Sequence, residues 1–416
     1  MIFQKRIFLC IVMSIYIFFS QNTTALAESG EQVTAGYKGG FFLKTENGQF
    51  KLKLGGRVTS HVWLYQRNSI THSDLFLTRA RVWFNATVWK HFLIRIQNEF
   101  LTDPSLRDAY LDVNYTPSLR FMIGQFKVPF SPEIIYSHKY IDLVERPVVV
   151  QRSLDPTRDV GAMIHGTAVQ SILKYQIALI SGAGQNLQDN NKDKDIVGRL
   201  MVSPFKLMKS NYFRDFSFGA AATYGKQPAL GGNSIYGQTV TGYRFYEPVA
   251  VKGDRLRLNA QLAWFAGPFS VKGEYIRTIE ERKDIVVSGQ TNLGDFETEG
   301  WYLTASWIIT GEKEQPDRPA PTSPFLVQGG ELNGTGLLKM ASRYEVFMLD
   351  SERRHGLAEP MPITFRAWTF GLTWYPVELI RISLDYQMQH FSDVARSPRP
   401  RHEVASLVMA RAQAEF

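Results

Sequence analysis

The stretch RLRLNAQLAWFAGPFSVKGEYIR, residues 255–277, decides the fold. Its two arms flank Gly267 and Pro268, residue types that are common in tight turns. In each arm apolar and polar residues alternate, which is the period of a β-strand with two unlike faces. The first arm places Leu256, Leu258, Ala260 and Leu262 on one face and Arg255, Arg257, Asn259 and Gln261 on the other. The stretch therefore predicts a β-hairpin with one face suited to lipid and the other to water.

The same alternation recurs along the chain from Lys51 to the last residue. It is clear in LIRISLDYQM (379–388) and in the C-terminal VMARAQAEF (408–416). A soluble β-sandwich also alternates, but it has no reason to concentrate aromatic residues beside its turns. Here four tryptophans lie beside turns, as in the interfacial girdle of a membrane barrel: Trp89, Trp264, Trp307 and Trp374.

The number of strands favours a transmembrane β-barrel. Sixteen strands are expected, an even number, with both chain ends on the periplasmic side. Their starts are expected near residues 51, 74, 92, 108, 119, 160, 173, 195, 214, 254, 269, 295, 340, 363, 379 and 403. The short turns then fall on the periplasmic side, and most long connections fall outside. The Pro-rich segment 312–334 is the exception, so either this periplasmic connection is unusually long or one strand is miscounted.

The N-terminus predicts export. Lys5 and Arg6 precede an apolar run, and the Ala25-Leu26-Ala27 sequence has the form of a signal-peptidase site, so cleavage is expected after Ala27. We expect a signal peptide over residues 1–27, a periplasmic segment over 28–50 and the barrel over 51–416. No later stretch approaches the roughly 18 consecutive apolar residues that a spanning helix needs.

Cysteine content and charge narrow the function classes. The single cysteine, Cys10, lies in the expected signal peptide, so no disulfide framework is expected. Loss of Lys5 and Arg6 lowers the formal charge from +8 to +6. This balance favours anions as partners.

Several segments in order carry a family resemblance. They include DAYLDVNYTPSLRFMIGQFKVPFSPE (108–133), LVERP (143–147), PTRDVGAMIHG (156–166) and the terminal RAQAEF (411–416). With these segments, which span residues 52–416, the chain resembles the phosphate-selective porin O and P family. The resemblance implies a homotrimer of 16-stranded antiparallel barrels in the bacterial outer membrane. It also implies that the third extracellular loop, about Val128 to Asp159, folds inward and narrows the pore.

One position departs from the phosphate-specific members of that family. The lysine that follows the Phe-Gly-Leu-Glu motif of the loop in those members corresponds here to Ile134, after Phe130-Ser131-Pro132-Glu133. The resemblance therefore favours an anion porin more strongly than a phosphate porin.

Basic residues on lumen-facing positions are the candidate anion-binding groups, because low-dielectric walls focus their field into the channel. We expect this role for Lys127, Lys139, Arg146, Arg79, Arg81, Arg255 and Arg257. Alternation adds Arg57, Arg95, Lys272, Arg381 and Arg411. The rival interpretation is that these groups pair with lumen acids and brace the wall; such acids are Glu99, Asp108, Asp112, Glu274 and Asp385.

The sequence thus predicts a porin for passive diffusion of small anions, with phosphate and polyphosphate as candidates. Its expected surroundings are outer-membrane lipid and lipopolysaccharide; no nucleic acid, metal or cofactor is implied. No catalytic motif is present, so we do not expect an enzyme. The alternatives are a general, weakly selective porin and a structural barrel without solute specificity.

Overall fold

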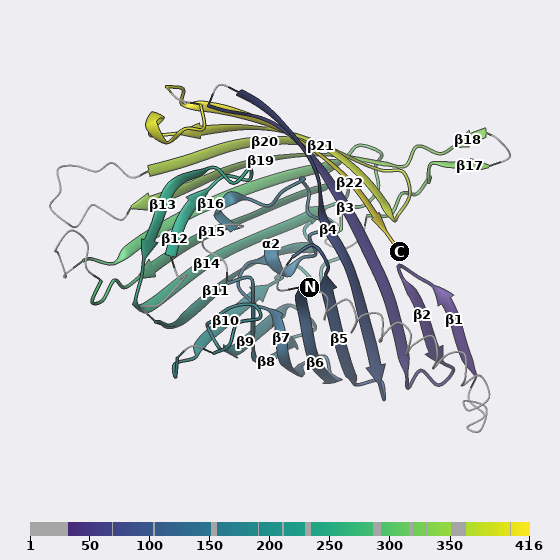
Figure 1. Ribbon diagram of the computed structural model, residues 1–416. Coiled ribbons are helices and arrows are strands. Elements are labelled where there is room, and N and C mark those ends of the chain that lie inside the picture. Colours follow the sequence, from purple (N-terminus) through teal and green to yellow (C-terminus); the bar gives the residue numbers. More distant parts are fainter. Residues whose placement is uncertain are drawn as a thin grey trace, which may run out of the picture.

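The computed structural model describes most of the chain (Figure 1): residues 32–68, 70–102, 105–150, 156–189, 191–209, 212–228, 234–285, 293–315, 319–328, 331–350, 363–399 and 401–416. The expected signal peptide, residues 1–27, lies outside the described residues. Within this part of the chain, no helix has the length and apolar character needed to cross a membrane.

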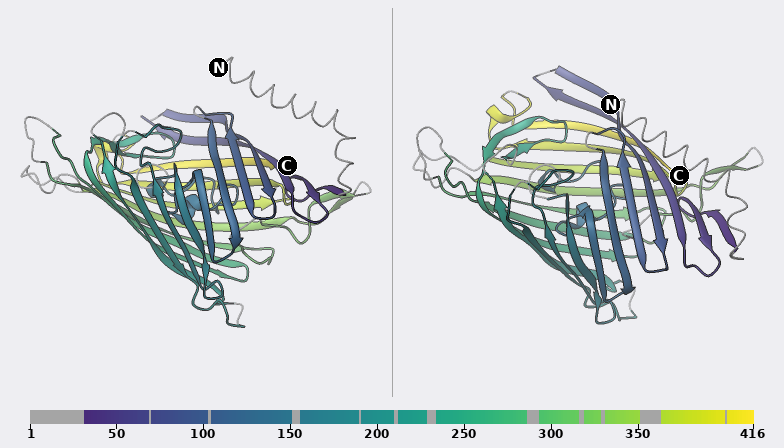
Figure 2. Two further views of the ribbon diagram at one scale, coloured as in Figure 1. Left: turned by 90° about the horizontal axis from the view of Figure 1, so that it is seen from below. Right: turned by 60° about the horizontal axis from the view of Figure 1, so that its bottom comes forward.

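Sixteen antiparallel strands of the described residues close into one barrel, and the expected strand count is confirmed (Figures 1 and 2). Closure comes from the last strand pairing with the first, over Leu407↔Tyr65 to Glu415↔Arg57. The barrel strands are β3 (Lys51–Arg67), β4 (Ile70–Val88), β5 (Phe92–Glu99), β6 (Leu106–Thr116), β7 (Leu119–Lys127), β8 (Arg158–Ala168), β9 (Leu173–Ile180), β10 (Asp195–Val202), β11 (Asp215–Gln227), β14 (Gly253–Ala266), β15 (Phe269–Glu280), β16 (Phe296–Ile308), β19 (Leu337–Asp350), β20 (Ile363–Tyr375), β21 (Ile380–Phe391) and β22 (Val404–Glu415).

The two faces of each strand follow the alternation of the sequence. In β14 the polar residues from Arg255 to Gln261 are buried inside the barrel, while the intervening residues, such as Leu258, point outward and are exposed. The C-terminal strand repeats the pattern, with Arg411 buried and Ala412 exposed. Each strand starts within four residues of its predicted position.

The Pro-rich connection after β16 is long, and no strand was miscounted. Two short strands, β17 (Leu326–Gln328) and β18 (Glu331–Asn333), pair within it and project from the end of the barrel that carries the C-terminus (Figure 1). The base of this projection is fixed, since the Phe325 N–H donates to the Pro376 carbonyl at 2.8 Å.

The segment before the barrel forms a hairpin of β1 (Val33–Tyr37) and β2 (Phe41–Thr45). Strand β2 pairs with Lys51–Leu54 of β3, directly beyond the C-terminal Phe416. The hairpin therefore covers the part of the β3 edge that β22 is too short to reach (Figure 2).

The apolar core lies inside the barrel rather than outside it. The described residues 128–150 and 156–157 of the connection between β7 and β8, which we call the β7–β8 loop, contain the short helix α2 (Pro132–Ile135) and pack against inner strand faces. A second hairpin, β12 (Ser234–Gln238) with β13 (Arg244–Ala250), packs its Phe245 ring on Phe365 at 5.2 Å. The 3-10 helix η3 (Val394–Arg396) lies in the last connection. The β7–β8 loop and the hairpin of β12 and β13 thus fill one side of the lumen.

Candidate functional site

A β-bulge sets the basic face of the first two barrel strands. The register between β3 and β4 shifts between Thr59 and Ser60, and the Thr78 hydroxyl donates to the Thr59 carbonyl at 3.2 Å. One extra residue in β4 changes which residues point inward beyond it. After the bulge along β4, Arg79 and Arg81 share the lumen face with Arg57, their neighbour on β3.

Wall carboxylates hold the backbone of the β7–β8 loop. Glu274 accepts hydrogen bonds from the Ser131 hydroxyl at 3.0 Å and the Glu133 N–H at 3.2 Å, and Asp385 accepts from the Val144 N–H at 2.6 Å. A loop inside a barrel loses water as a partner, so its buried N–H groups need such acceptors.

Two of the expected pore cations bind loop carbonyls instead. The guanidinium of Arg381 donates to the carbonyls of Lys139 and Ile141 at 3.0 and 2.8 Å. That of Arg411 donates to the carbonyls of His138 and Val144. Both arginines therefore brace the loop.

A cluster of ion pairs joins the β7–β8 loop to the barrel wall and to the Pro-rich connection. Asp142 lies between two ammonium groups, with its carboxylate 2.5 Å from Lys272 Nζ and 2.7 Å from Lys339 Nζ. Lys339 also pairs at 2.7 Å with Glu314, which belongs to the Pro-rich connection. We call Asp142, Lys272, Lys339 and Glu314 the Asp142 cluster.

What remains open is a cavity of about 510 Å³ between the β7–β8 loop and strands β3 to β9, which we call the lumen cavity. Its described lining contains nine cationic side chains and one carboxylate, Asp108. The cations are Lys53, Arg57, Arg79, Arg81, Arg95, Lys127, Lys139, Arg146 and Arg158.

Some of these cations have carboxylate partners. Arg95 and Arg158 share the two oxygens of Asp108, at 3.1 and 2.8 Å. Arg81 pairs with Glu99 at 2.5 Å. The Lys139 ammonium lies 2.8 Å from Glu415 and 3.6 Å from the centre of the Trp83 ring, a cation–π contact. For these residues the bracing interpretation holds in part.

Arg57 and Arg79 differ from these paired cations, because each has buried guanidinium nitrogens that lack an acceptor among the described residues. These are Nε and Nη1 of each side chain, and Arg57 is only 1% exposed. The remaining Arg79 contact goes from Nη2 to His138 Nε2 at 3.0 Å, while Arg411 Nη2 lies 3.2 Å from Nδ1 of the same ring. A neutral imidazole has one acceptor nitrogen, so it can serve only one of the two arginines.

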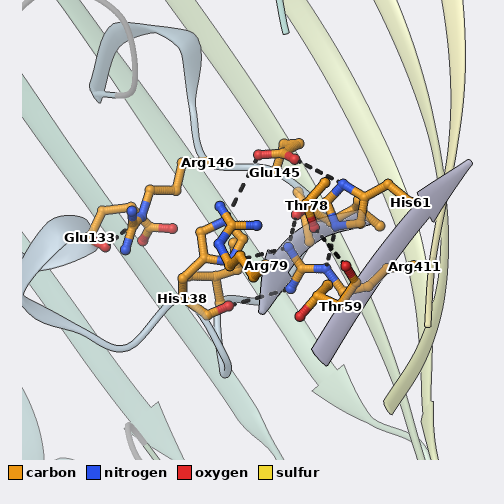
Figure 3. Close-up of polar contacts among 12 residues, drawn as sticks. Thr59, His61, Thr78, Arg79, Glu133, His138, Glu145, Arg146 and Arg411 are labelled. Carbon is orange, nitrogen blue, oxygen red and sulfur yellow. Dashed lines mark hydrogen bonds and ion pairs between the residues drawn. The ribbon is translucent and has the colours of Figure 1, made fainter. Parts of the chain in front are cut away.

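Figure 3 shows how the loop places His138 and Glu145 beside Arg79 and Arg411. Burial, with the charges of Arg79 and Arg411, lowers the pKa of His138 well below its ordinary value, so the ring is neutral at pH 7. Burial alone would raise the pKa of Glu145. The polar contact with His61 Nδ1, 3.1 Å away, and the charge of Arg79 outweigh that effect and lower the pKa of Glu145 to about 2.

Two loop-facing cations have carbonyl partners. Lys127 Nζ donates to the carbonyls of Ile135 and Tyr136, both at 3.0 Å, and Arg146 Nε donates to the Glu133 carbonyl at 2.9 Å. A carbonyl is neutral, so these bonds position the cation without cancelling its charge.

The predicted residues separate into two groups. Five of the seven line the lumen cavity: Lys127, Lys139, Arg146, Arg79 and Arg81. Arg255 and Arg257 do not; they lie on β14, where Arg255 pairs with Asp195 at 2.8 Å. Alternation identified Arg57 as facing the lumen but gave no sign that two of its nitrogens lack an acceptor among the described residues. Sequence reasoning missed His138, which carries no motif of its own.

Ile134 does not face the cavity. Its side chain is 3% exposed and packs in the apolar core inside the barrel, whereas the next residue, Ile135, lines the cavity. The Lys127 ammonium, bonded to the Ile135 carbonyl, occupies the cavity beside this helix end.

Comparison with known proteins gives a consistent set of similarities. Residues 95–416 match the family model described as phosphate-selective porin O and P. Porin O of Pseudomonas aeruginosa is 21% identical over 401 residues, covering 86% of this chain and 87% of that protein.

Solved structures share the fold. A loop-deletion mutant of the outer-membrane protein OmpT of Vibrio cholerae has a TM-score of 0.59 at 11% identity, covering 88% of this chain and all of that chain. An anion-selective porin from Comamonas acidovorans has a TM-score of 0.54 at 11% identity, again with 88% and 100% coverage. The outer-membrane channel DcaP of Acinetobacter baumannii has a TM-score of 0.54 at 12% identity, covering 92% of this chain and all of that chain.

Proposed function

Because the chain belongs to the phosphate-selective porin O and P family, we propose that it is an outer-membrane porin through which small anions diffuse passively. The observation that carries this proposal is the lining of the lumen cavity, with nine cationic side chains and one carboxylate among the described residues. The structural similarity to an anion-selective porin supports the same sign of selectivity. Passive diffusion needs neither catalysis nor a cofactor, and the proposal includes neither.

The guanidinium groups of Arg57 and Arg79 line the cavity and give it a positive field that attracts an anion. An anion that enters the pore loses part of its hydration shell, and fixed N–H groups replace it. Guanidinium groups match the geometry of phosphate and carboxylate, with two parallel hydrogen bonds. We therefore include phosphate among the solutes.

Lys127 takes part of the role that the lysine expected at Ile134 would have. Its ammonium donates to the carbonyls at the end of α2, so a positive charge lies beside the position where the loop lysine is missing. The cavity therefore has a cation near residue 134, although that residue is not a lysine.

Three further features belong to the proposal. The first is cleavage of the signal peptide after Ala27. The second is assembly into a homotrimer surrounded by outer-membrane lipid and lipopolysaccharide. The third is that both chain ends and the β17–β18 projection lie in the periplasm, on the side of the short turns.

A planar bilayer under a KCl gradient tests the proposal. We expect discrete channels whose reversal potential indicates preference for chloride over potassium, and chloride current that falls as phosphate is titrated in. A weakly selective current that phosphate does not change would instead indicate a general porin. Absence of current steps would indicate a structural barrel closed by its loop.

Lysine substitutions at Ile134 and Ile135 are expected to affect different properties, one the stability of the barrel and the other its block by phosphate. Ile135→Lys adds an ammonium to the lumen cavity and is expected to strengthen phosphate block several-fold. Ile134→Lys buries an ammonium in the apolar core, which is expected to cost roughly 3 kcal/mol or more of unfolding free energy without strengthening block. Urea titration in detergent and phosphate titration in bilayers measure the two effects. Stronger block by Ile134→Lys would show that residue 134 faces the pore.

A further inference from the structure

We propose that the lumen cavity prefers anions that carry an apolar group, such as aryl or alkyl phosphates and carboxylates, to bare inorganic anions. This inference rests on the proposed function, since it specifies the class of solute that the same cavity admits.

The lining of the lumen cavity has two unlike sectors. The unmet guanidinium donors come from Arg57 on β3 and Arg79 on β4. Strands β6, β7 and β8 contribute Tyr110, Met122 and Met163 as well as the charged Asp108, Lys127 and Arg158. Met122 and Met163 are direct partners in the β7–β8 register, so their side chains lie next to each other on the wall.

More apolar side chains extend this second sector. Phe126 lines the cavity from β7, Ile135 from helix α2 and Trp83 from β4. Because Met122, Met163 and Phe126 belong to the apolar core inside the barrel, the sector is the side of a packed cluster that borders the cavity and not a set of isolated side chains. We call Tyr110, Met122, Phe126 and Met163 the apolar sector.

An inorganic anion interacts favourably only with the cationic side chains of the lining. Next to the apolar sector it would lose water and gain no hydrogen bond, which is unfavourable. An anion with an aryl or alkyl group can place its charged end on the guanidinium donors and its apolar end on the apolar sector, which removes apolar surface from water. Methionine side chains suit such a role, because they are flexible and adapt to ligands of different shape.

The size of the cavity is compatible with an organic anion. Its volume of about 510 Å³ falls within the range of about 300–1,000 Å³ that is usual for sites of small organic ligands. A passage shaped only for a bare phosphate ion would need much less room.

Phenyl phosphate and methyl phosphate provide the test, because at pH 8 both are dianions with the same head group. We expect phenyl phosphate to half-block the KCl current of the wild-type channel at about a tenfold lower concentration than methyl phosphate. In the double variant Met122→Gln/Met163→Gln this ratio is expected to fall to about one. The matched variant Met122→Leu/Met163→Leu, which keeps the sector apolar, is expected to retain the wild-type ratio.

The outcomes separate this inference from the function on which it rests. An anion-selective wild-type channel that both phosphates block equally would overturn the inference alone. A ratio that stays at ten in the glutamine variant would also overturn it, since the apolar sector would then not be the cause. A wild-type channel without anion selectivity would overturn the proposed function itself. If the double variant does not fold, Met122→Gln alone supplies the comparison. The ratio of the two half-blocking concentrations is then expected to fall as well.

Discussion

Replacing Arg57 and Arg79 together with glutamine is expected to lower the anion-to-cation permeability ratio about tenfold. Both guanidinium groups line the lumen cavity, and both have buried donors without an acceptor among the described residues. Their charges are therefore less compensated than that of Arg81, which is paired with Glu99. Removing them takes away two of the nine cations in the described lining of the cavity.

Reversal potentials in planar bilayers measure the effect, and phosphate titration checks that block weakens in parallel. The matched control is Arg277→Gln, which removes the same charge from an exposed position on β15 that pairs with Glu297 outside the lumen. The control is expected to keep the wild-type selectivity. If the double variant also keeps it, the field of the remaining cations is sufficient, and Arg57 and Arg79 are structural.

The barrel was predictable because its cause is local. A strand between lipid and lumen must alternate, and turns must separate the strands, so residues 255–277 contain all the information needed for one hairpin. Repetition of that pattern gave sixteen strands. The long connection 312–334 was flagged for the same reason, since it broke the rule that the other turns obeyed.

The candidate site was predictable only in part, because its cause is not local. Arg57, Arg79, Arg255 and Arg257 all satisfy the same alternation. What separates them is the path of the β7–β8 loop and the position of acids on other strands. Asp195 is such an acid: it pairs with Arg255, although the two residues are far apart in the sequence. Nothing in the alternation of a single strand encodes these partners. The bulge at Thr59, on which the basic face depends, likewise leaves no turn residue in the sequence.

Asp142→Asn is expected to release the β7–β8 loop from the wall. The substitution leaves Lys272 without its carboxylate and Lys339 with Glu314 alone, inside a barrel where both ammoniums are shielded from bulk water. Breaking a buried pair by removing one partner typically costs about 3–5 kcal/mol, and we expect a loss of this size in the free energy of unfolding. A loop that has lost this anchor narrows the pore less, so larger and noisier single-channel currents are expected as well.

Urea titration in detergent measures the first effect and single-channel recording the second. Asp189→Asn is the matched control, because Asp189 forms an exposed pair with Lys194 and its loss is expected to cost at most about 1 kcal/mol. Burial would raise the pKa of Asp142, but Lys272 and Lys339 outweigh that effect and hold the pKa below the ordinary carboxylate value of 3.8. The stabilisation by the Asp142 carboxylate is therefore complete above pH 3.8. It is lost only as the pH falls toward the lower pKa of Asp142 in the folded protein. Titration of Asp142 is thus not expected to change the wild-type conductance between pH 8 and pH 5. A variant with wild-type stability and conductance would mean that the carbonyl contacts of Arg381 and Arg411 hold the loop without the Asp142 cluster.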